Sequence, residues 1–337
     1  MAKTRTDHGS GSVFRFSTRS FSAPLSSLTL ALTLALGTPV GLFDFLFGKG
    51  KSGGSPKRGL KRITVAKRFE LGGRTGQGSM SKVYRAYDRE LGRTVCLKIL
   101  DKVKTKKFEE RFVGLKKPHE GEICAALKHE NIVRTFENGL TETGEPYLVM
   151  EWVEGLGLNY LVETRAPQMT GNRINFLGQL CDALQYMHDN KWLHRDLCPR
   201  NVMVNTDGVL KLIDFGLTIP YTPAFCVGGN RTGTPDILAP EILKRKTTDH
   251  RVDLFALGVT AYEVFTSQLP WERSPSSEET FRRRLNQPPR EAKDLAPGID
   301  DRLNDVLLKA ISRDPADRYP SATAFKDALA KLKKQDY

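Results

Sequence analysis

The chain has 337 residues, of which 39% are hydrophobic, and its formal net charge is +13. This is enough chain for one large domain or two modest ones, and the composition excludes a collagen, a disordered tail protein and a multi-span membrane protein. The five cysteines form no Cys-x-x-Cys pair, which argues against a disulfide scaffold or a Cys-rich zinc module and favours a reducing cytosol.

The positive charge is concentrated near the N-terminus. Residues 1–68 hold twelve Lys or Arg against two Asp or Glu, whereas residues 69–337 hold 40 against 37. Because the body of the chain is nearly neutral, we predict that it binds no nucleic acid.

Residues 1–62 are predicted to be a flexible or membrane-proximal leader and linker. Their apolar stretch, Leu25–Phe47, is long enough to cross a bilayer, but Pro39 and Asp44 interrupt it. The Gly/Lys/Ser-rich stretch 48–62 that follows is typical of a flexible linker.

Several interpretations of this leader stay open. Residues 25–36 are similar to a signal-peptide core, and residues 25–47 to a single membrane span with its C-terminal side inside. Residues 41–47, followed by lysines, are similar to an interfacial anchor for an anionic membrane. Alternatively, Val40 is the translation start, and the residues before it are not translated.

Residues 69–151 have mainly the pattern of β-strands. Strands are predicted at 83–86 and 94–100, where β-branched and aromatic residues gather, and a buried strand at 147–150. The apolar spacing over 119–128 predicts one helix between them.

Beyond Gly155 the pattern becomes largely helical, and helices are predicted at 173–189, 251–266, 301–312 and 322–333. The sequence therefore predicts an α+β fold in which a small β-rich lobe precedes a larger, mainly helical lobe.

A glycine-rich turn and a lysine stand in the β-rich part. Gly76 and Gly78 begin a Gly-Gln-Gly-Ser-Met-Ser-Lys-Val run ending at Val83, and glycines let a backbone approach phosphate oxygens closely. Such turns are common, and this one is not a P-loop. Lys98 lies in an apolar strand, where it needs a partner or a solvated exit, and Glu120 on the next helix is a candidate counter-charge.

Two acids and an amide frame a short hairpin in the helical part. Asp196 and Asn201 precede its predicted strands, 202–204 and 209–212, and Asp214 follows them. Carboxylate and amide oxygens suit Mg²⁺, which normally shares its shell with phosphates. A further acid nearby can accept a proton from an attacking hydroxyl group.

In this order the motifs resemble those of eukaryotic-type (Hanks-type) Ser/Thr protein kinases. The compactness of the domain that contains them suggests a bacterial member. The motifs that carry the resemblance are the Gly-rich loop, the strand with Lys98, His194-Arg195-Asp196 with Asn201, Asp214-Phe215-Gly216, and Ala239-Pro240-Glu241. The resemblance implies a bilobal protein-kinase fold over residues 69–333, with an N-lobe at 69–150, a hinge at 151–154 and a C-lobe at 155–333.

The resemblance implies that ATP binds between the lobes with Mg²⁺, or with Mn²⁺. The implied ATP-binding residues are Gly76, Gly78, Val83, Lys98, Met150, Glu151, Val153 and Met203.

Roles in phosphoryl transfer follow from the same resemblance. Lys98 is expected to hold the α- and β-phosphates and to pair with Glu120, with Glu122 as the second choice. Asp196 is expected to accept the proton of the substrate hydroxyl. The implied metal ligands are Asn201 and Asp214.

One departure from the family pattern bears on catalysis. Cys198 stands where the family usually has a Lys that contacts the γ-phosphate, so one charge that stabilises transfer is missing. Arg200, placed as in receptor-type tyrosine kinases, either replaces that charge as a catalytic residue or only faces solvent. Both alternatives stay open.

The activation segment resembles that of Ser/Thr-specific kinases, because Thr234 lies between Gly and Pro ahead of Ala-Pro-Glu. Arg195 implies that a phosphate on this segment orders it by pairing with that arginine. Thr232 is the first candidate phosphosite, followed by Thr218 and Thr222, and the alternative is that none is phosphorylated.

The predicted function is ATP-dependent phosphorylation of Ser and Thr in proteins, including the chain itself. The alternative is a pseudokinase, a nucleotide-binding signalling scaffold, which only Cys198 favours. Protein substrates are the predicted partners, with peripheral or single-span membrane contact through residues 25–62. Export would separate a kinase from ATP, so the predicted location is the cytoplasm or the cytoplasmic face of the membrane.

Overall fold

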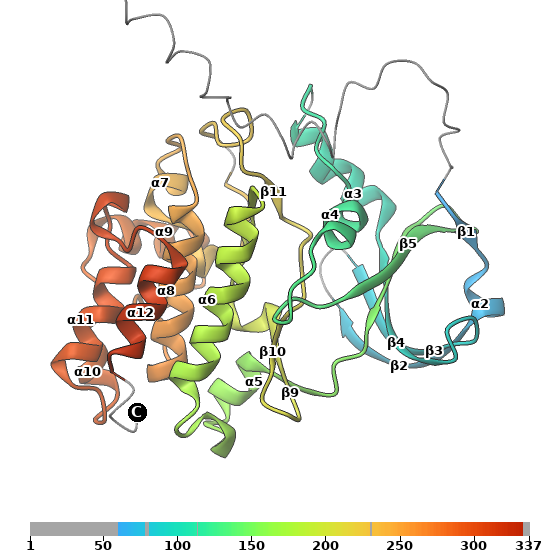
Figure 1. Ribbon diagram of the computed structural model, residues 1–337. Helices are drawn as coiled ribbons and strands as arrows, with labels where there is room; N and C mark the ends of the chain where they lie inside the picture. Colours follow the sequence, from blue (N-terminus) through green and yellow to red (C-terminus); the bar gives the residue numbers. More distant parts are fainter. Residues whose placement is uncertain (1–59, 78–80, 113, 230, 333–337) are drawn as a thin grey trace, which may run out of the picture. The chain divides into compact units, whose positions relative to one another are not determined.

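The computed structural model describes residues 60–77, 81–112, 114–229 and 231–332, which form two lobes (Figure 1). The N-terminal lobe contains a curled six-stranded sheet with the strand order β1-β5-β6-β4-β3-β2. Its strands are β1 (Arg62–Ile63), β2 (Phe69–Gln77), β3 (Ser81–Asp88), β4 (Arg93–Leu100), β5 (Thr135–Thr141) and β6 (Pro146–Glu151). Its helices are α2 (Val65–Arg68), α3 (Lys102–Glu109) and α4 (Glu120–Ala126).

The C-terminal lobe is mainly helical. Its helices are α5 (Leu158–Glu163), α6 (Arg173–Asp189), α7 (Pro240–Leu243), α8 (Arg251–Thr266), α9 (Ser277–Asn286), α10 (Ala292–Leu295), α11 (Asp301–Ala310) and α12 (Ala322–Ala330). Its short strands are β7 (Gly155–Gly157), β8 (Trp192–Leu193), β9 (Val202–Asn205), β10 (Leu210–Leu212) and β11 (Ile219–Pro220). These elements confirm the predicted bilobal α+β fold.

The alternation of side chains along β4 places a lysine on the inner face of the sheet. Val95 and Leu97 pack in an outer apolar cluster that includes Tyr147. Because successive residues of a strand point to opposite faces, Cys96 and Lys98 lie on the other face, where Cys96 packs against the main core. The pleat of one strand therefore directs Lys98 towards the C-terminal lobe.

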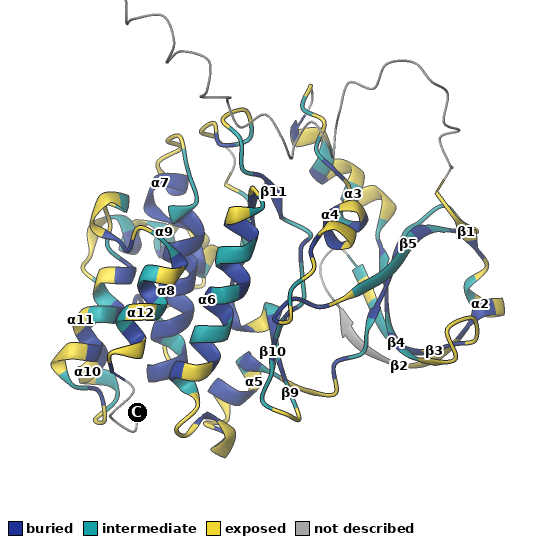
Figure 2. Ribbon diagram, in the orientation of Figure 1, coloured by how far each residue is buried: buried dark blue, intermediate teal, exposed yellow. Residues whose placement is uncertain are grey.

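Helix α8 forms the centre of the C-terminal lobe. Its sequence is apolar nearly all round, which is typical of a helix surrounded by other elements, and it is buried on almost every side (Figure 2). Among its buried residues is the acid Asp253, which is fully shielded from solvent. This burial requires partners for the carboxylate, and they lie in the candidate active site.

The sheet begins before the expected domain boundary at residue 69. Strand β1 pairs in parallel with β5, with Arg62 opposite Leu140. Gly139 permits this pairing, because a Cβ there would collide with the carbonyl oxygen of Lys61. Arg62, the last residue of the predicted linker, is thus the first residue of this strand, which depends on a long-range pairing that composition does not reveal.

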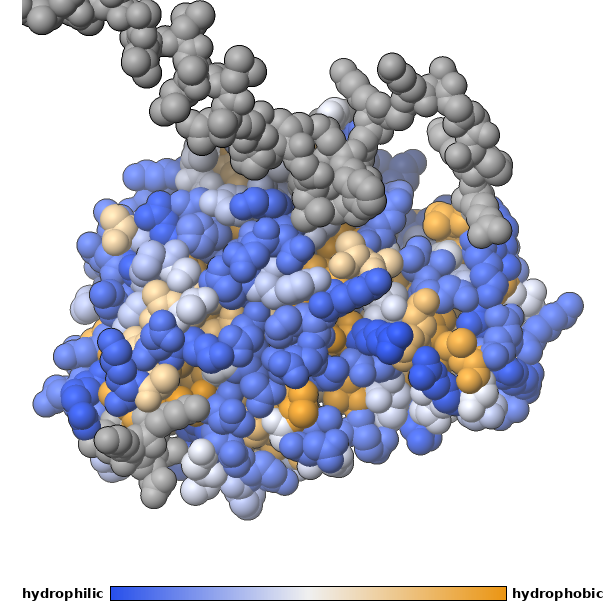
Figure 3. Space-filling view, viewed as in Figure 1, coloured by the Kyte–Doolittle hydropathy of each residue, from blue (hydrophilic) through white to orange (hydrophobic). Residues whose placement is uncertain are grey.

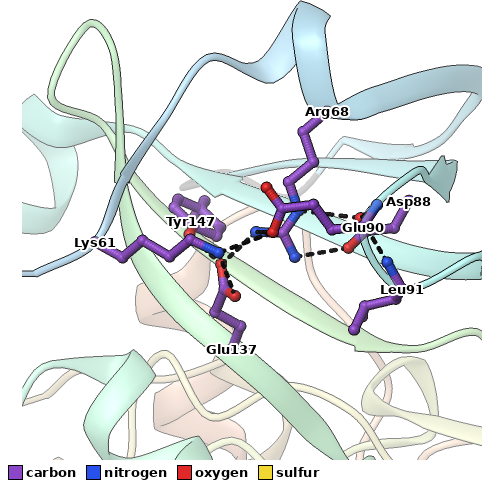
Figure 4. Close-up of polar contacts among 7 residues, drawn as sticks. All are labelled: Lys61, Arg68, Asp88, Glu90, Leu91, Glu137 and Tyr147. Atoms are coloured by element: carbon purple, nitrogen blue, oxygen red, sulfur yellow. Dashed lines mark hydrogen bonds and ion pairs between the residues drawn. The ribbon is translucent and has the colours of Figure 1, made fainter.

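A buried arginine joins this N-terminal segment to the sheet (Figure 4). Arg68 is 5% exposed and donates to both carboxylate oxygens of Asp88, at 3.0 and 2.7 Å, and to Glu137 at 2.5 Å. Glu137 also accepts hydrogen bonds from Tyr147 and Lys61. The network therefore ties the residues before 69 to three strands of the sheet.

The face of the molecule in Figure 3 is mostly hydrophilic, with apolar side chains in small groups. None of the helices in the described ranges is both long and apolar enough to cross a membrane. The membrane contacts predicted for residues 25–47 fall outside the described residues.

Candidate active site

Lys98, Glu120 and Asp214 meet between the two lobes. The Nζ atom of Lys98 lies 2.6 Å from Glu120 Oε1 and 2.9 Å from Asp214 Oδ1. Glu120 is the first residue of α4, whereas Glu122 is exposed and accepts a hydrogen bond from the backbone N–H of His119 at the helix start. The structure therefore pairs Lys98 with Glu120 and not with Glu122.

The environment of this trio fixes its charges. Burial alone would lower the pKa of Lys98, but Asp214 and Glu120 outweigh it and raise that pKa well above its usual range. Burial would likewise raise the pKa of Asp214, yet Lys98 and the N–H of Gly216 hold it below its usual value. Burial does raise the pKa of Glu120, in spite of Lys98. The site thus keeps a cation and an anion side by side.

Asp196 is held in place by hydrogen bonds from two directions. Asn201 Nδ2 donates to Asp196 Oδ2 at 3.0 Å, and the backbone N–H of Thr234 donates to Asp196 Oδ1 at 2.9 Å. The side chain of Asn201 also binds the backbone carbonyl of Asp196 at 2.7 Å. A carboxylate fixed in this way is suited to orient a hydroxyl group and accept its proton.

The loop that carries Asp196 is anchored to the buried acid of α8. Asp253 accepts hydrogen bonds from the backbone N–H groups of His194 and Arg195, at 2.9 and 2.8 Å, and lies 3.0 Å from His188 Nε2. Arg195 has a left-handed backbone with φ of 67°, a strained conformation for a residue with a side chain. The buried carboxylate holds this strain in place.

Asn201 and Asp214 are neighbours through the backbone. The N–H of Ile213 donates to the carbonyl oxygen of Asn201 at 3.0 Å, which brings the following residue, Asp214, next to that loop. One carboxylate and one amide oxygen are ligands that Mg²⁺ accepts together with phosphate oxygens and water. The residues present therefore fit a magnesium ion bound with a nucleotide.

Three of the expected ATP-binding residues, Met150, Glu151 and Val153, lie where the N-terminal lobe ends. Cys96 on β4 lies opposite Met150 on β6, and Val95 lies opposite Glu151. Val153 is buried at the start of the connection between the lobes. Burial raises the pKa of the Cys96 thiol to about 11, so this side chain is a neutral, apolar surface at pH 7.

Three other expected contacts are placed by the strand register. Met203 on β9 lies opposite Gly157 of β7 and packs against the main core. Gly76 pairs with Val83 in the β2–β3 hairpin, and Val83 lies opposite Lys98. Gly78 lies outside the described residues.

Cys198 and Arg200 differ in their surroundings. Cys198 is buried, and burial raises the pKa of its thiol to about 11, so it is neutral next to Asp196 at pH 7. Arg200 is exposed on the short helical turn Pro199–Asn201. Arg200 is therefore a cation near Asp196 that lies at the surface.

The three candidate phosphosites lie in different environments. Thr218 is fully buried, whereas Thr222 and Thr232 are partly exposed. The Oγ1 atom of Thr232 accepts a hydrogen bond of 2.5 Å from Arg111 Nη1, which lies just after α3. Arg111 was not predicted, because nothing in its Lys/Glu-rich surroundings indicates a partner 121 positions away.

Apolar contacts also join residues 108–112, at the end of α3 and just after it, to residues 225–226. Phe112 lies 5.7 Å, ring to ring, from Phe225 and 5.5 Å from Phe108. Phe108, Phe112 and Cys226 belong to one buried cluster. Elements of the two lobes therefore pack together beside the expected site residues.

Comparison with known proteins identifies the relatives of this chain. The family model described as protein kinase domain matches residues 69–330. Serine/threonine-protein kinase PknB of Mycobacterium leprae is 32% identical over 80% of this chain and 43% of its own length. Serine/threonine-protein kinase Pkn1 of Myxococcus xanthus is 35% identical over 77% of this chain and 38% of its own length. The chain thus spans less than half the length of these two curated relatives.

Proposed function

The chain belongs to the protein kinase family, and from this premise we propose that it transfers the γ-phosphate of ATP to Ser and Thr hydroxyl groups of proteins. The observation that carries the proposal is that Lys98 and Glu120 of the N-terminal lobe meet Asp214 of the C-terminal lobe, whose neighbours Asp196 and Asn201 are hydrogen-bonded to each other. These are the groups that phosphoryl transfer requires for holding phosphates, metal and the attacking hydroxyl.

Each of the site residues has a separate role in this proposal. Lys98 binds phosphate oxygens, and Glu120 holds Lys98 in position. Asn201 and Asp214 hold Mg²⁺, which neutralises phosphate charge when it is bound with ATP. Asp196 orients the substrate hydroxyl and takes its proton, while Thr234 and Asn201 keep the carboxylate turned towards the cleft.

The proposal is tested by incubating the purified chain with Mg²⁺ and γ-labelled ATP, with and without myelin basic protein. We expect label on Ser and Thr of the chain or of the added protein, identified by mass spectrometry. Nucleotide binding without any transfer, over a range of protein substrates, would favour the pseudokinase instead.

The presence of Cys198 where the family usually has a lysine leads to a measurable prediction about Arg200. We propose that Arg200 supplies the charge absent at Cys198, in which case Arg200→Ala should lower kcat by about 10²-fold. Cys198→Lys should restore much of this loss in the double variant, because it places a cation two residues after Asp196. An Arg200→Ala variant with unchanged kcat would show that the arginine only faces solvent.

We also propose that a phosphate on Thr232 activates the kinase, and that Arg111 is one of the groups that bind it. Arg111 already lies at hydrogen-bond distance from the Thr232 hydroxyl, and a phosphate there would form charge-assisted hydrogen bonds with it. Arg195 of the catalytic loop is the second proposed partner.

The Thr232 proposal predicts a phosphorylation-dependent difference in activity. Phosphatase treatment should lower the activity of the wild type by about tenfold or more, since a docked phosphate contributes one to three charge-assisted hydrogen bonds. Thr232→Ala and Arg111→Ala should start at that lower level and respond little to phosphatase. Equal activity before and after complete dephosphorylation of Thr232 would contradict the proposal.

For the leader we propose contact with the cytoplasmic face of a membrane through residues 25–62, which the apolar and basic pattern of the sequence supports. Fractionation of cells that produce the full chain, beside a chain beginning at Lys61, tests this. The shorter chain should retain kinase activity and lose any membrane association.

A further inference from the structure

The segment 234–238 adjoins Asp196, where the hydroxyl group of a protein substrate is proposed to bind. The backbone N–H of Thr234 donates to Asp196, the carboxylate proposed to receive the substrate proton. A peptide whose hydroxyl group reaches Asp196 therefore passes beside this segment. Gly233 precedes it with φ of 142°, and a Cβ there would meet the side chain of Leu238 at 2.8 Å. The geometry of the segment is thus part of the substrate site.

One side chain of the C-terminal lobe forms hydrogen bonds with the backbone of this segment. Arg284, on α9, is 2% exposed. Its Nη1 atom donates to the carbonyl oxygens of Pro235 and Leu238, at 2.7 and 2.8 Å, and its Nη2 atom donates to that of Asp236 at 2.6 Å. A single guanidinium group therefore fixes three of the five carbonyl groups in the segment.

The carboxylate of Asp236 is near enough to act on the charge of Arg284 and to counter the lowering of its pKa by burial, but it forms no ion pair with Arg284. Among the described residues no Asp or Glu forms an ion pair with it, and the side chain of Asp236 pairs instead with the exposed Arg273, at 2.6 Å. Burial lowers the pKa of Arg284 to about 10, which still leaves it charged at pH 7. Its guanidinium lies over the rings of Phe255 and Trp271, at 5.9 and 5.5 Å. Backbone carbonyl groups and aromatic faces thus contact the guanidinium directly, and the charge of Asp236 acts on it without an ion pair.

A buried arginine of this kind is a poor device for stability alone. Removing a charge from water is unfavourable, and apolar side chains of similar volume often serve a protein core equally well or better. What an apolar side chain cannot do is orient three carbonyl groups at once, because the planar guanidinium offers five N–H donors in a fixed arrangement. The specific consequence of Arg284 is therefore the shape of segment 234–238.

The helix register singles out this arginine from its neighbours. Arg282 and Arg283 precede it directly, but both pair with Glu279 on the more exposed side of α9. Only Arg284 of the three is buried. All three residues are arginines, so the sequence alone does not tell them apart. The packing of α9 against segment 234–238 determines which of them is buried.

Helix α7, which follows segment 234–238, is held by a second arginine. Arg318 donates to both carboxylate oxygens of Glu241, at 2.7 and 2.8 Å, and its guanidinium lies 4.8 Å from the ring centroid of Phe255. Phe255 therefore lies in contact range of both guanidinium groups. Segment 234–238 and the helix α7 that follows it are held at two points that share one ring of α8.

We propose that Arg284 is a positioning residue for the protein substrate: it fixes the carbonyl groups of residues 235, 236 and 238, and so gives the substrate-binding segment the shape that presents a hydroxyl group to Asp196. The inference rests on the proposed function, since it assigns a role in binding a protein that receives phosphate. It assigns no contact between Arg284 and ATP.

The test compares Arg284→Met and Arg284→Lys with the wild type and with Arg290→Met. Arg290 is a matched control, because it also donates to a backbone carbonyl, that of Leu269 at 2.6 Å, but none of its hydrogen bonds or ion pairs reaches segment 234–238. For each protein, KM and kcat are measured with myelin basic protein, together with KM for ATP and the rate of ATP hydrolysis without protein substrate. Hydrogen exchange of the segment and the melting temperature are measured in parallel.

We expect Arg284→Met to raise KM for the protein substrate by about tenfold or more, while KM for ATP and ATP hydrolysis stay within about twofold of the wild type. Its segment 234–238 should exchange faster, and Arg284→Lys should recover part of both effects. Arg290→Met should change neither.

An Arg284→Met protein with wild-type KM for protein and wild-type exchange of the segment would overturn the inference. So would a loss shared equally by protein phosphorylation and ATP hydrolysis, because that is the signature of a structural role. A wild type that binds ATP but transfers no phosphate contradicts the proposed function, and with it a substrate role for Arg284. The wild-type measurement thus separates the two failures.

Discussion

Replacing Lys98 by Met is expected to lower phosphoryl transfer by at least about 10²- to 10³-fold, because it removes a preorganised cation from the phosphates. The fold should survive the change. Glu120 loses its partner, but burial already raises its pKa, so the carboxyl group can take a proton instead of staying charged.

The measurement for Lys98→Met is kcat with a protein substrate, beside the melting temperature. Lys106→Met is the control, since Lys106 is an exposed lysine of α3 with no part in the proposed site. A Lys98→Met protein that melts like the wild type and keeps most of its kcat would show that this lysine is not the phosphate-binding group.

The second large effect concerns stability. Arg68→Ala is expected to lower the free energy of unfolding by about 3–5 kcal/mol, the usual result of leaving one partner of a buried ion pair alone. Asp88 is fully buried and would lose two hydrogen bonds from the guanidinium. Arg89→Ala is the control, because Arg89 and Glu70 are at least half exposed, and exposed pairs contribute about 0–1 kcal/mol.

The Arg68 effect should depend on pH. Burial alone would raise the pKa of Asp88, but Arg68 and the N–H groups of Glu90 and Leu91 outweigh it and lower that pKa. A lowered pKa contributes stability above the ordinary pKa of Asp, about 3.9, and this contribution is lost as the pH falls through the folded-state value. In Arg68→Ala the unpaired carboxyl group takes a proton more readily.

The stability difference between wild type and Arg68→Ala should therefore be largest near pH 7 and shrink as the pH falls towards about 4. Urea unfolding at several pH values measures it. A difference that is small at pH 7, or that grows on acidification, would contradict a structural role for the buried pair.

The sequence predicted those parts of the fold that follow from local pattern. Helices α6 and α8 lie at the predicted residues, 173–189 and 251–266, because long apolar runs with helical spacing leave few alternatives. The pairing of Lys98 with Glu120 was also predicted, but from the family's spacing, since Glu122 lies on the same helix.

The features that were not predicted depend on contacts between distant residues. Strand β1 is two residues long and lies in a basic stretch, and only its pairing with β5 makes it a strand. Arg111 donates a hydrogen bond to Thr232, and Arg284 donates hydrogen bonds to carbonyl groups in segment 235–238. Both contacts depend on how helices pack in the tertiary structure, which no local sequence pattern indicates. Charged residues in a polar stretch look solvent-exposed until the tertiary structure buries one of them.

The most direct test of the kinase account is phosphoryl transfer from γ-labelled ATP, measured side by side for the wild type and Asp214→Asn, with the melting temperature as the measure of folding. We expect the wild type to label Ser or Thr, and Asp214→Asn, folded equally well, to transfer no detectable phosphate, because Mg²⁺ loses its carboxylate ligand. Equal labelling by the two proteins would contradict the account.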